Sequence, residues 1–591
     1  MPARQQDWDI KITLAGVTKF FRLLQTRDRN SNAIRKLWDV QEVEPTTAFA
    51  NFAQEDWQWG VGLNRAGISL DRPGHVFRYA DGFGIDTSKS GKVLHGPGST
   101  SIGTISGTVK DFLLFSNKVW ILTTSNLYSW DGATLTNVWT NLDGALNLNM
   151  VKHGSLIVIC TSRFSGGNSR YYTSDGVTTT ARDTATAGAN LVMYVLDKQL
   201  WRAHSTNLID STTTPTNTAS WSTDITVGEG DTITNLFSLS GLLFVTNAQG
   251  IFAVAADNSV TELDKRLGTR RSTTAFSIKA GFGSDAWFSD GTKKVIHAVA
   301  LDFETFDIRP DGPFYHRDSR PVSETAIEGT VSSIAMDLEA VYITAKRGAD
   351  VYVFKGVEVE RGEYVWSPFI RIASATNNAA AVMKMTGDAS PKLYLNNGTA
   401  ILTYDLEDWA LYNTSYEFIT YYDARNDESL VKLYTRLKTF LDVVGASVSI
   451  EVFRRVDTVT GWTTLGSISS SGLNTQNAGI LTNQRVQLRF VLTSSNSASH
   501  IDLRSFNLEG IVVPELRRIF DFVLVADSKP AADFLYSLRT TIAALPIMED
   551  RRGVARTIAV LPSYPREREQ EDAVLGEPVM TYHIIAQEVP A

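Results

Sequence analysis

The sequence has little of what marks several common classes of protein. It holds a single cysteine in 591 residues, so no disulfide can form within the chain, and Cys160 lies in the apolar run 156–160, where a buried position is expected.

Charged residues make up only 20%, with a thinly spread net charge of −8, which argues against the concentrated basic face of a dedicated nucleic-acid binder. No stretch approaches the roughly 18 apolar residues of a membrane span, and the start lacks a signal segment. We expect a soluble protein made in a cytoplasm.

Catalytic and metal-binding motifs are also missing. No Gly-x-Ser-x-Gly elbow, Walker-type phosphate loop or Gly-x-Gly-x-x-Gly after a strand is present. No two histidines have the close spacing of a metal pair; the eight are His75, His95, His153, His204, His297, His316, His500 and His583. We therefore expect no catalytic, cofactor or metal residues and no enzymatic activity. The absence of local motifs does not exclude an active site assembled from residues far apart in the sequence.

Aromatic and β-favouring residues are plentiful, and they recur in a fixed order. The repeated unit is an apolar strand, a break, a second strand and an aromatic strand that ends near Asp-Gly, most fully in residues 112–132. Equivalent positions follow one another at steps of 37 to 55 residues, about 46 on average: Trp120, Ile157, Trp201, Leu243, Trp287, Tyr342 and Tyr394. Propeller blades have such a period. The pattern predicts a β-propeller of about seven blades over residues 101–418, with six or eight blades, a solenoid or stacked sandwiches as alternatives.

Four dipeptides in these repeats are expected to supply the positive φ of two-residue hairpin turns. They are Asp131-Gly132, Asp175-Gly176, Asp290-Gly291 and Asn397-Gly398.

The regions on either side of the repeats have different patterns. Residues 1–100 are interpreted as an N-terminal strand at 8–14 and an extended arm, laid against this propeller or a neighbouring subunit. Residues 419–512 alternate apolar and polar side chains, as in 448–452 and 486–492, which predicts a β-sandwich.

Residues 513–591 predict a small α+β module. Its strands are expected at 519–525, 558–561 and 580–586, and its helix from Ser528 through Phe534, Leu535, Leu538 and Ile542. The mixed-charge run 566–572 between two strands is expected to be a solvated loop.

Some polar and aromatic residues could carry a site. Propeller glycosidases gather carboxylates from several blades, but the candidates are expected to be turn formers: Asp197, Asp257, Asp285 and Asp337. An acidic stretch lacks the spacing of an EF-type calcium loop and is expected to be a solvated loop: Asp302, Glu304, Asp307 and Asp311. A set of aromatics could stack on sugars or bury in an interface, with core packing the commonest fate: Trp57, Trp59, Trp409, Tyr421 and Tyr422.

The order of these modules resembles tail or baseplate proteins of tailed bacteriophages. The resemblance rests on the Trp-rich segment 56–62, the segment 84–87, the aromatic Asp-Gly repeats and the sandwich that follows them. It implies a non-enzymatic structural component of the virion tail (baseplate, tail tip or nozzle). Such a chain would form a symmetric homo-oligomer and assemble with other tail proteins through its terminal modules, with the propeller as a rigid outer body. Alternatives are a host-attachment protein that binds a surface glycan or receptor and, third, a propeller glycosidase.

Overall fold

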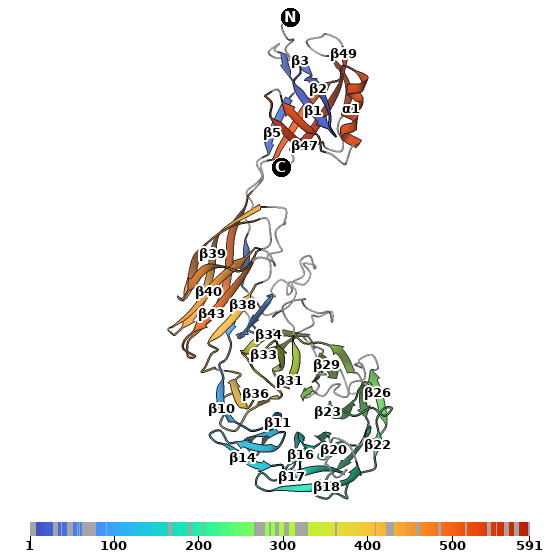
Figure 1. Cartoon of the computed structure of the whole chain (residues 1–591), viewed down its shortest axis with the longest axis vertical. Coiled ribbons are helices and arrows are strands. Elements are labelled where there is room, and N and C mark those ends of the chain that lie inside the picture. Colours follow the sequence, from blue (N-terminus) through green and yellow to red (C-terminus); the bar gives the residue numbers. More distant parts are fainter. Residues whose placement is uncertain are drawn as a thin grey trace. The chain divides into compact units, whose positions relative to one another are not determined.

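The computed structural model of the chain is mainly β, with 49 strands and one helix among the residues that it describes (Figure 1). These residues are 8–27, 34–36, 38–43, 51–55, 57, 60–61, 79–89, 91–162, 168–187, 192–204, 206–264, 278–282, 285–289, 295–300, 306–313, 329–360, 363–407, 409–420, 431–445, 447–456, 461–482, 486–513, 517–540, 545–550, 552–560, 566–571 and 578–588. The chain divides into two compact units: unit 1 holds residues 1–50, 429–433 and 511–591, and unit 2 holds 51–428 and 434–510. Within these described ranges, no helix has the length and apolar character that a membrane crossing requires.

Unit 2 contains a ring of four-stranded antiparallel sheets, of which the described residues form seven. Six of them are built from consecutive strands: β11–β14 (Val109–Phe115, Lys118–Thr123, Asn126–Trp130, Leu135–Thr140), β15–β18 (Asn147–His153, Leu156–Thr161, Asn168–Ser174, Thr179–Ala187), β19–β22 (Val192–Leu196, Gln199–His204, Leu208–Thr212, Ile225–Thr226), β23–β26 (Asn235–Leu239, Leu242–Thr246, Ile251–Val254, Val260–Asp264), β27–β30 (Ile278–Phe282, Asp285–Ser289, Val295–Ala300, Phe306–Pro310) and β31–β34 (Thr330–Met336, Ala340–Arg347, Asp350–Glu360, Glu363–Ile372). The seven repeat positions predicted from the sequence, Trp120 to Tyr394, all lie on the second strand of a sheet.

The seventh sheet closes the ring, because its fourth strand comes from the beginning of the repeats. It joins β35 (Ala380–Met383), β36 (Lys392–Asn397) and β37 (Ala400–Asp405) to β10 (Thr100–Thr104), with Thr100 opposite Thr403. The first strand of each sheet adjoins the first strand of the next, and β35 returns to β11 (Figure 1). This is the architecture of a β-propeller.

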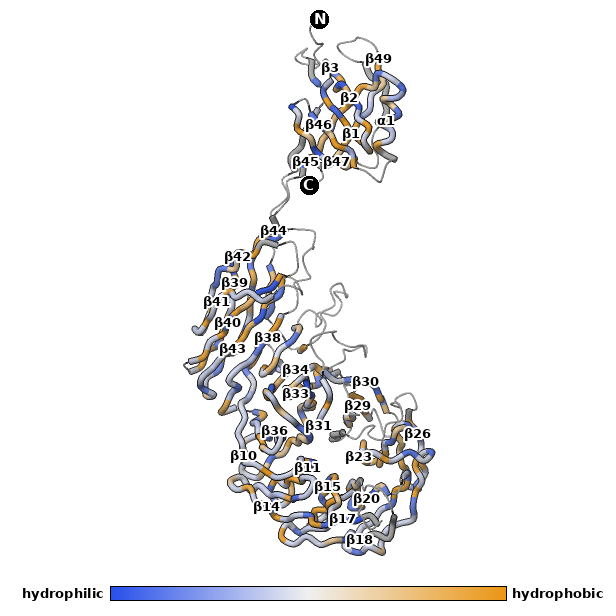
Figure 2. The backbone as a smooth tube through the Cα atoms, in the orientation of Figure 1, coloured by the Kyte–Doolittle hydropathy of each residue, from blue (hydrophilic) through white to orange (hydrophobic). Residues whose placement is uncertain are grey.

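Hydrophobic side chains fill the spaces between neighbouring sheets. Between the first and second sheets, Trp120 and Leu122 of β12 pack with Ile157 and Ile159 of β16. Similar clusters join the other sheets, and one that includes Val109 joins the first sheet to the last. Figure 2 shows hydrophobic residues spread over all the sheets of unit 2. Cys160 is fully buried in one of these clusters, as predicted.

The Asp-Gly turns have the expected positive φ but are longer than predicted. Gly132 and Gly176 have φ of 100° and 94°, yet four residues connect the paired strand ends, at 131–134 and 175–178. The carboxylates of Asp131 and Asp175 accept backbone N–H bonds within these loops. Only the Asn397-Gly398 loop has two residues, Gly398 and Thr399, between its paired ends. Asp290 and Gly291 lie outside the described residues.

Two further sheets of unit 2 pack against each other. One has the order β41-β40-β43-β38-β7 (Thr463–Ile468, Val448–Arg455, Gln487–Ser494, Ser415–Ile419, Asp81–Phe83), and the other β42-β39-β44-β6 (Gly472–Thr482, Val431–Val444, His500–Val513, Phe52–Gln54). Phe490 on β43 contacts Phe506 on β44, with ring centroids 5.8 Å apart. Along β40, Val448, Ile450 and Val452 are buried, which confirms the predicted alternation. A short pair, β8 (Ile85–Asp86) with β9 (Leu94–His95), crosses from these sheets to the propeller.

Unit 1 is a closed six-stranded barrel made by both ends of the chain. Its strand order is β49 (Pro578–Glu588), β47 (Ala555–Val560), β46 (Ile547–Asp550), β1 (Ile10–Leu14), β2 (Val17–Leu23) and β45 (Arg517–Val525), which pairs back to β49. The strand β5 (Trp38–Val43) extends one edge, and β3 (Gln25–Arg27) pairs with β4 (Ile34–Lys36). The helix α1 (Lys529–Thr540) packs Phe534, Leu535 and Leu538 into the barrel core, as predicted.

Two expectations for the ends of the chain differ from the structure. The predicted strand at 8–14 is confirmed as β1, but the rest of the N-terminal region is not a simple arm: it gives β2–β5 to unit 1 and β6 and β7 to the two packed sheets, and β10, which begins at Thr100, joins the propeller. The charged run 566–572 was expected to be a loop, and that expectation is wrong, because β48 (Arg566–Glu571) pairs with β49. Within the described sheet β48 lies at the edge of the strand order, a position where charged residues are well tolerated.

Candidate functional site

A polar cavity of about 530 Å³ lies in unit 2, between the propeller and the two packed sheets. Its lining residues come from four parts of the chain: β8, β9 and residues 88, 89 and 92 between them; the β31–β32 turn with β32 and β33; residues 391, 406, 407, 409 and 412; and the start of β44. Small-ligand sites commonly have volumes of roughly 300–1,000 Å³. The cavity is therefore large enough for a small organic molecule.

A buried ion pair forms one wall of this cavity. The Lys355 ammonium donates to the Asp86 carboxylate at 2.8 Å and to the Ser88 hydroxyl at 3.2 Å. Burial alone would raise the pKa of Asp86, but Lys355 and the bonds from Ser88 outweigh it and lower that pKa below its ordinary value. Lys92 similarly contacts Asp502 at 3.4 Å. Two of the three lysines that line the cavity are therefore paired with carboxylates.

Tyr342 lies where negative charge gathers around the cavity. Its side chain is only 2% exposed, its ring packs 6.0 Å from Phe369, and it lines the cavity. Its pKa is raised well above the ordinary value, first by burial and then by four surrounding carboxylates, those of Asp337, Asp86, Glu339 and Glu407. The residues described give its hydroxyl group no hydrogen-bond partner.

Aromatic rings also line the cavity. Trp409 is half-buried and packs edge-on against Phe369 and Tyr412, at centroid distances of 5.7 and 6.2 Å. Tyr412 stacks on His500 at 4.1 Å. Burial lowers the pKa of the neighbouring His95 to about 3, so this imidazole is neutral near pH 7 and adds no positive charge to the cavity.

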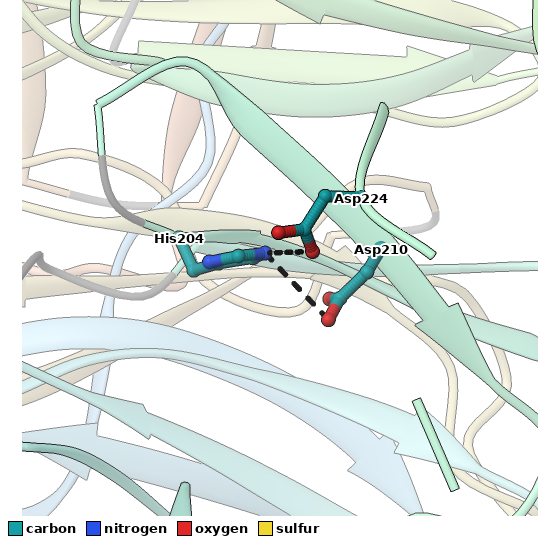
Figure 3. Close-up of side chains that lie close together, drawn as sticks. All are labelled: His204, Asp210 and Asp224. Carbon is teal, nitrogen blue, oxygen red and sulfur yellow. Dashed lines mark hydrogen bonds and ion pairs between the residues drawn. The ribbon is translucent and has the colours of Figure 1, made fainter. Parts of the chain in front are cut away.

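A second cluster, on the β19–β22 sheet, brings Arg202 together with three further side chains, His204, Asp210 and Asp224, which Figure 3 shows. Arg202 on β20 lies opposite Asp210 on β21 and donates two bonds to it, at 2.7 and 2.6 Å. The Nε2 atom of His204 lies 3.6 Å from Asp210 Oδ2 and 3.0 Å from Asp224 Oδ1. The Arg202 guanidinium also stacks on Trp221, 3.8 Å from the ring centroid. The cluster therefore fastens the segment 213–224 to two central strands.

The same three acceptors, His204, Asp210 and Asp224, place their ligand atoms within 4.8 Å of one another, which is close enough for one metal ion. Arg202 already satisfies both oxygens of Asp210, and a cation there would lie beside a guanidinium. The alternation of Arg202, Asp210, His204 and Asp224 accounts for the geometry as an ion-pair network, so we assign no ligand to it.

A third cluster surrounds His297 on β29. Its imidazole stacks on Trp287, with centroids 4.0 Å apart, while Nε2 lies 2.8 Å from Asp285 and Nδ1 3.5 Å from Asp311. Burial alone would lower the pKa of His297, but the two carboxylates outweigh it and raise that pKa above its ordinary value. The propeller thus holds an imidazole between two carboxylates.

The candidate residues from the sequence have different fates. Trp57 is fully buried against Phe418 and cannot stack on a ligand, whereas Trp409 lines the cavity. Asp197 lies in a positive-φ turn, and Asp257 and Asp337 accept N–H bonds of their own turns, as predicted. Asp285 was expected to form a turn, and that expectation is wrong: it begins β28 and binds His297. Trp59, Tyr421, Tyr422, Asp302 and Glu304 lie outside the described residues, as do His75 and His316.

Sequence reasoning missed the residues that meet across long separations. Asp86 and Lys355 are 269 positions apart, and Tyr342 was noted only as a repeat position. The Arg202–Asp210 pair did carry a local signal, because both residues lie in adjacent strands of one predicted repeat.

The Arg202 network predicts unequal effects for two similar substitutions. Asp210→Asn leaves the buried Arg202 without its counter-charge and should lower the free energy of unfolding of unit 2 by about 3–5 kcal/mol. Asp224→Asn, at a side chain 48% exposed, should cost under about 1 kcal/mol. Urea unfolding followed by tryptophan fluorescence measures both, and equal losses would contradict the network described.

The His297 cluster predicts a pH dependence of stability. Because its folded-state pKa lies above the unfolded value of about 6.5, the stabilisation is complete below that value and is lost as pH rises through the folded pKa. The stability advantage of the wild type over His297→Asn should therefore shrink as the pH rises above about 6.5. His153→Asn, which removes only a bond to the Lys198 carbonyl, is the control. A difference independent of pH would refute the prediction.

The comparisons with known proteins leave the family open. No protein-family model matches the chain. No curated protein matches it. Among solved structures, U3-55K is 9% identical, with 53% of this chain and 100% of that chain covered and a TM-score of 0.39. YCF48 from Cyanidioschyzon merolae is 11% identical (52% and 98% covered, TM-score 0.36), and the WD40 domain of Neurospora crassa Pan2 is 10% identical (52% and 96%, TM-score 0.34). These similarities carry no argument about function.

Proposed function

We propose that the chain is a non-enzymatic structural component of a bacteriophage tail, in the baseplate, tail tip or nozzle, and that it assembles with other tail proteins and with copies of itself. In this proposal the seven four-stranded sheets are the seven blades of one propeller, which serves as a rigid outer body. The two packed sheets are a β-sandwich, and the terminal barrel is the assembling module. The protein would reside in the virion after synthesis in the host cytoplasm.

The observation that carries the proposal is the distribution of exposed apolar side chains. Seven of the fifteen exposed large hydrophobic residues that the structure describes lie in unit 1, although unit 1 holds less than a quarter of the chain: Val17, Phe20, Tyr536, Leu545, Ile547, Val554 and Met580. Phe20 and Ile547 come from the strands on either side of β1. Exposed apolar residues that gather in one part of a protein favour an interaction surface there.

The closed barrel also offers a rigid surface for binding other subunits. Its six strands close on themselves, so the barrel proper offers no free edge for unspecific strand pairing. The propeller closes in the same way through β10. The barrel and the propeller are closed β structures, and the one cysteine is free. Their stability therefore does not depend on a disulfide that could be reduced outside a cell, which agrees with a component of a virus particle.

Charge reversal on the barrel surface tests the assembly role. The double variant Phe20→Glu/Ile547→Glu should convert symmetric oligomers of the wild type to monomers in light scattering, because charges replace apolar contacts. Leu146→Glu/Val444→Glu, at apolar positions of unit 2 with similar exposure, is the matched control and should leave the oligomer intact.

Labelling of the chain in purified phage particles tests its location, and label at the tail end is the expected result. A wild type that is monomeric both alone and with tail proteins, or particles that lack the chain, would contradict the proposal.

Attachment to a host-surface glycan is the second candidate function, favoured by one observation: the half-buried Trp409 lines a polar cavity. Aromatic faces beside polar groups suit sugar rings. Trp409→Ala should reduce saturable binding of the chain to host polysaccharide without loss of fold, measured by biolayer interferometry. Trp462→Ala, at a half-buried tryptophan outside the cavity, is the control. Equal binding by both variants would exclude this use of Trp409.

A further inference from the structure

The cavity beside Tyr342 has an excess of negative charge. Three lysines and five carboxylates line it, and two of the lysines, Lys92 and Lys355, are already paired with Asp502 and Asp86. The remaining lysine, Lys89, is exposed, and three further carboxylates line the cavity: Asp337, Glu339 and Glu407. A ligand that fits this balance of charge is a cation.

One tyrosine hydroxyl opens into this cavity. The Tyr342 side chain is only 2% exposed and lines the cavity, and its hydroxyl makes no hydrogen bond with the described residues. The hydroxyl oxygen is not among the fully buried atoms without a partner, so it is open to the cavity, where a ligand can reach it. The hydroxyl can accept a hydrogen bond from a ligand N–H group.

The aromatic wall adds a third requirement. Trp409 and Tyr412 present rings to the same cavity, and an indole face attracts an organic cation. The volume of about 530 Å³ is far larger than a bare metal ion needs. An organic body with an ammonium group satisfies the charge, the hydroxyl and the rings together.

We propose that this cavity binds a small organic ammonium ligand, with the ammonium group near Tyr342, Glu339 and Glu407 and the body of the ligand against Trp409. An amino sugar with a free amino group is the form that would link this site to the second candidate function. The site does not depend on the assembly role.

Calorimetric titration of the full chain with three matched sugars tests the proposal. Glucosamine carries the ammonium group, whereas N-acetylglucosamine and glucose keep the ring and lack the charge. Glucosamine should bind at millimolar concentration and the two neutral sugars at least about tenfold more weakly, because a charged hydrogen bond is lost. Equal binding of all three, or no binding of glucosamine or choline, would overturn the proposal.

Three variants locate the site. Tyr342→Phe removes only the hydroxyl and keeps the ring beside Phe369, and Glu407→Gln removes one exposed carboxylate; each should weaken glucosamine binding several-fold to about tenfold. Glu229→Gln, an exposed position outside the cavity lining, should change nothing. Thermal melting confirms the fold of each variant. Unchanged affinity in both Tyr342→Phe and Glu407→Gln would refute the site.

Choline separates the two sources of an ammonium group. If choline binds as tightly as glucosamine, the site reads the cation alone, and if glucosamine binds more tightly, the sugar ring contributes through Trp409; both outcomes support the ammonium site. Retained glucosamine binding together with absent polysaccharide binding would contradict glycan attachment and support the ammonium site. Polysaccharide binding without any preference for an ammonium group would support glycan attachment and contradict the ammonium site.

Discussion

The structure depends on the pairing of N-terminal strands with sheets that the rest of the chain leaves incomplete. β1 and β2 close the terminal barrel, β6 and β7 extend the two packed sheets, and β10 supplies the last strand of the propeller. An unpaired sheet edge presents backbone N–H and C=O groups that would otherwise invite aggregation. Residues 10–104 therefore contribute strands to the barrel, to the two packed sheets and to the propeller, and none of these bodies is completed by a continuous segment alone.

Buried charged side chains are also paired with partners of opposite charge. Asp86 with Lys355, Arg202 with Asp210, and His297 with Asp285 each place opposite charges together where water is scarce. The first of these pairs joins β8 to the propeller, whereas the other two each join neighbouring strands of one sheet. Removing one partner of such a pair leaves the other charge buried without a counter-charge, which costs more free energy than the intact pair contributes.

The sequence predicted the local features of this fold well. The repeat period placed all seven marker residues on second strands, because blade cores reuse the same apolar and aromatic pattern. The alternation along 448–452 and the helical spacing of Phe534, Leu535 and Leu538 were also confirmed. Strand pairing over long separations was not predicted: Thr13 pairs with Ile547 and Thr100 with Thr403, and no spacing in the chain reveals such partners. The cavity was not predicted for the same reason: its lining residues come together only after folding, among them Asp86, Tyr342, Trp409 and Asp502. The charged strand β48 was mistaken for a loop because its composition resembles a solvated surface.

The position of β10 sets an order of events during synthesis. Thr100 emerges from the ribosome some 300 residues before its partner Thr403, so the ring must stay open while six sheets form. At a translation rate of about 5–20 residues per second, this interval lasts roughly 15 to 60 s. During that time the apolar face of β11, which later meets β35, has no neighbour on one side. Until the last sheet arrives, this apolar face is therefore exposed to aggregation, and a chaperone that covers it would raise the yield of folded chain.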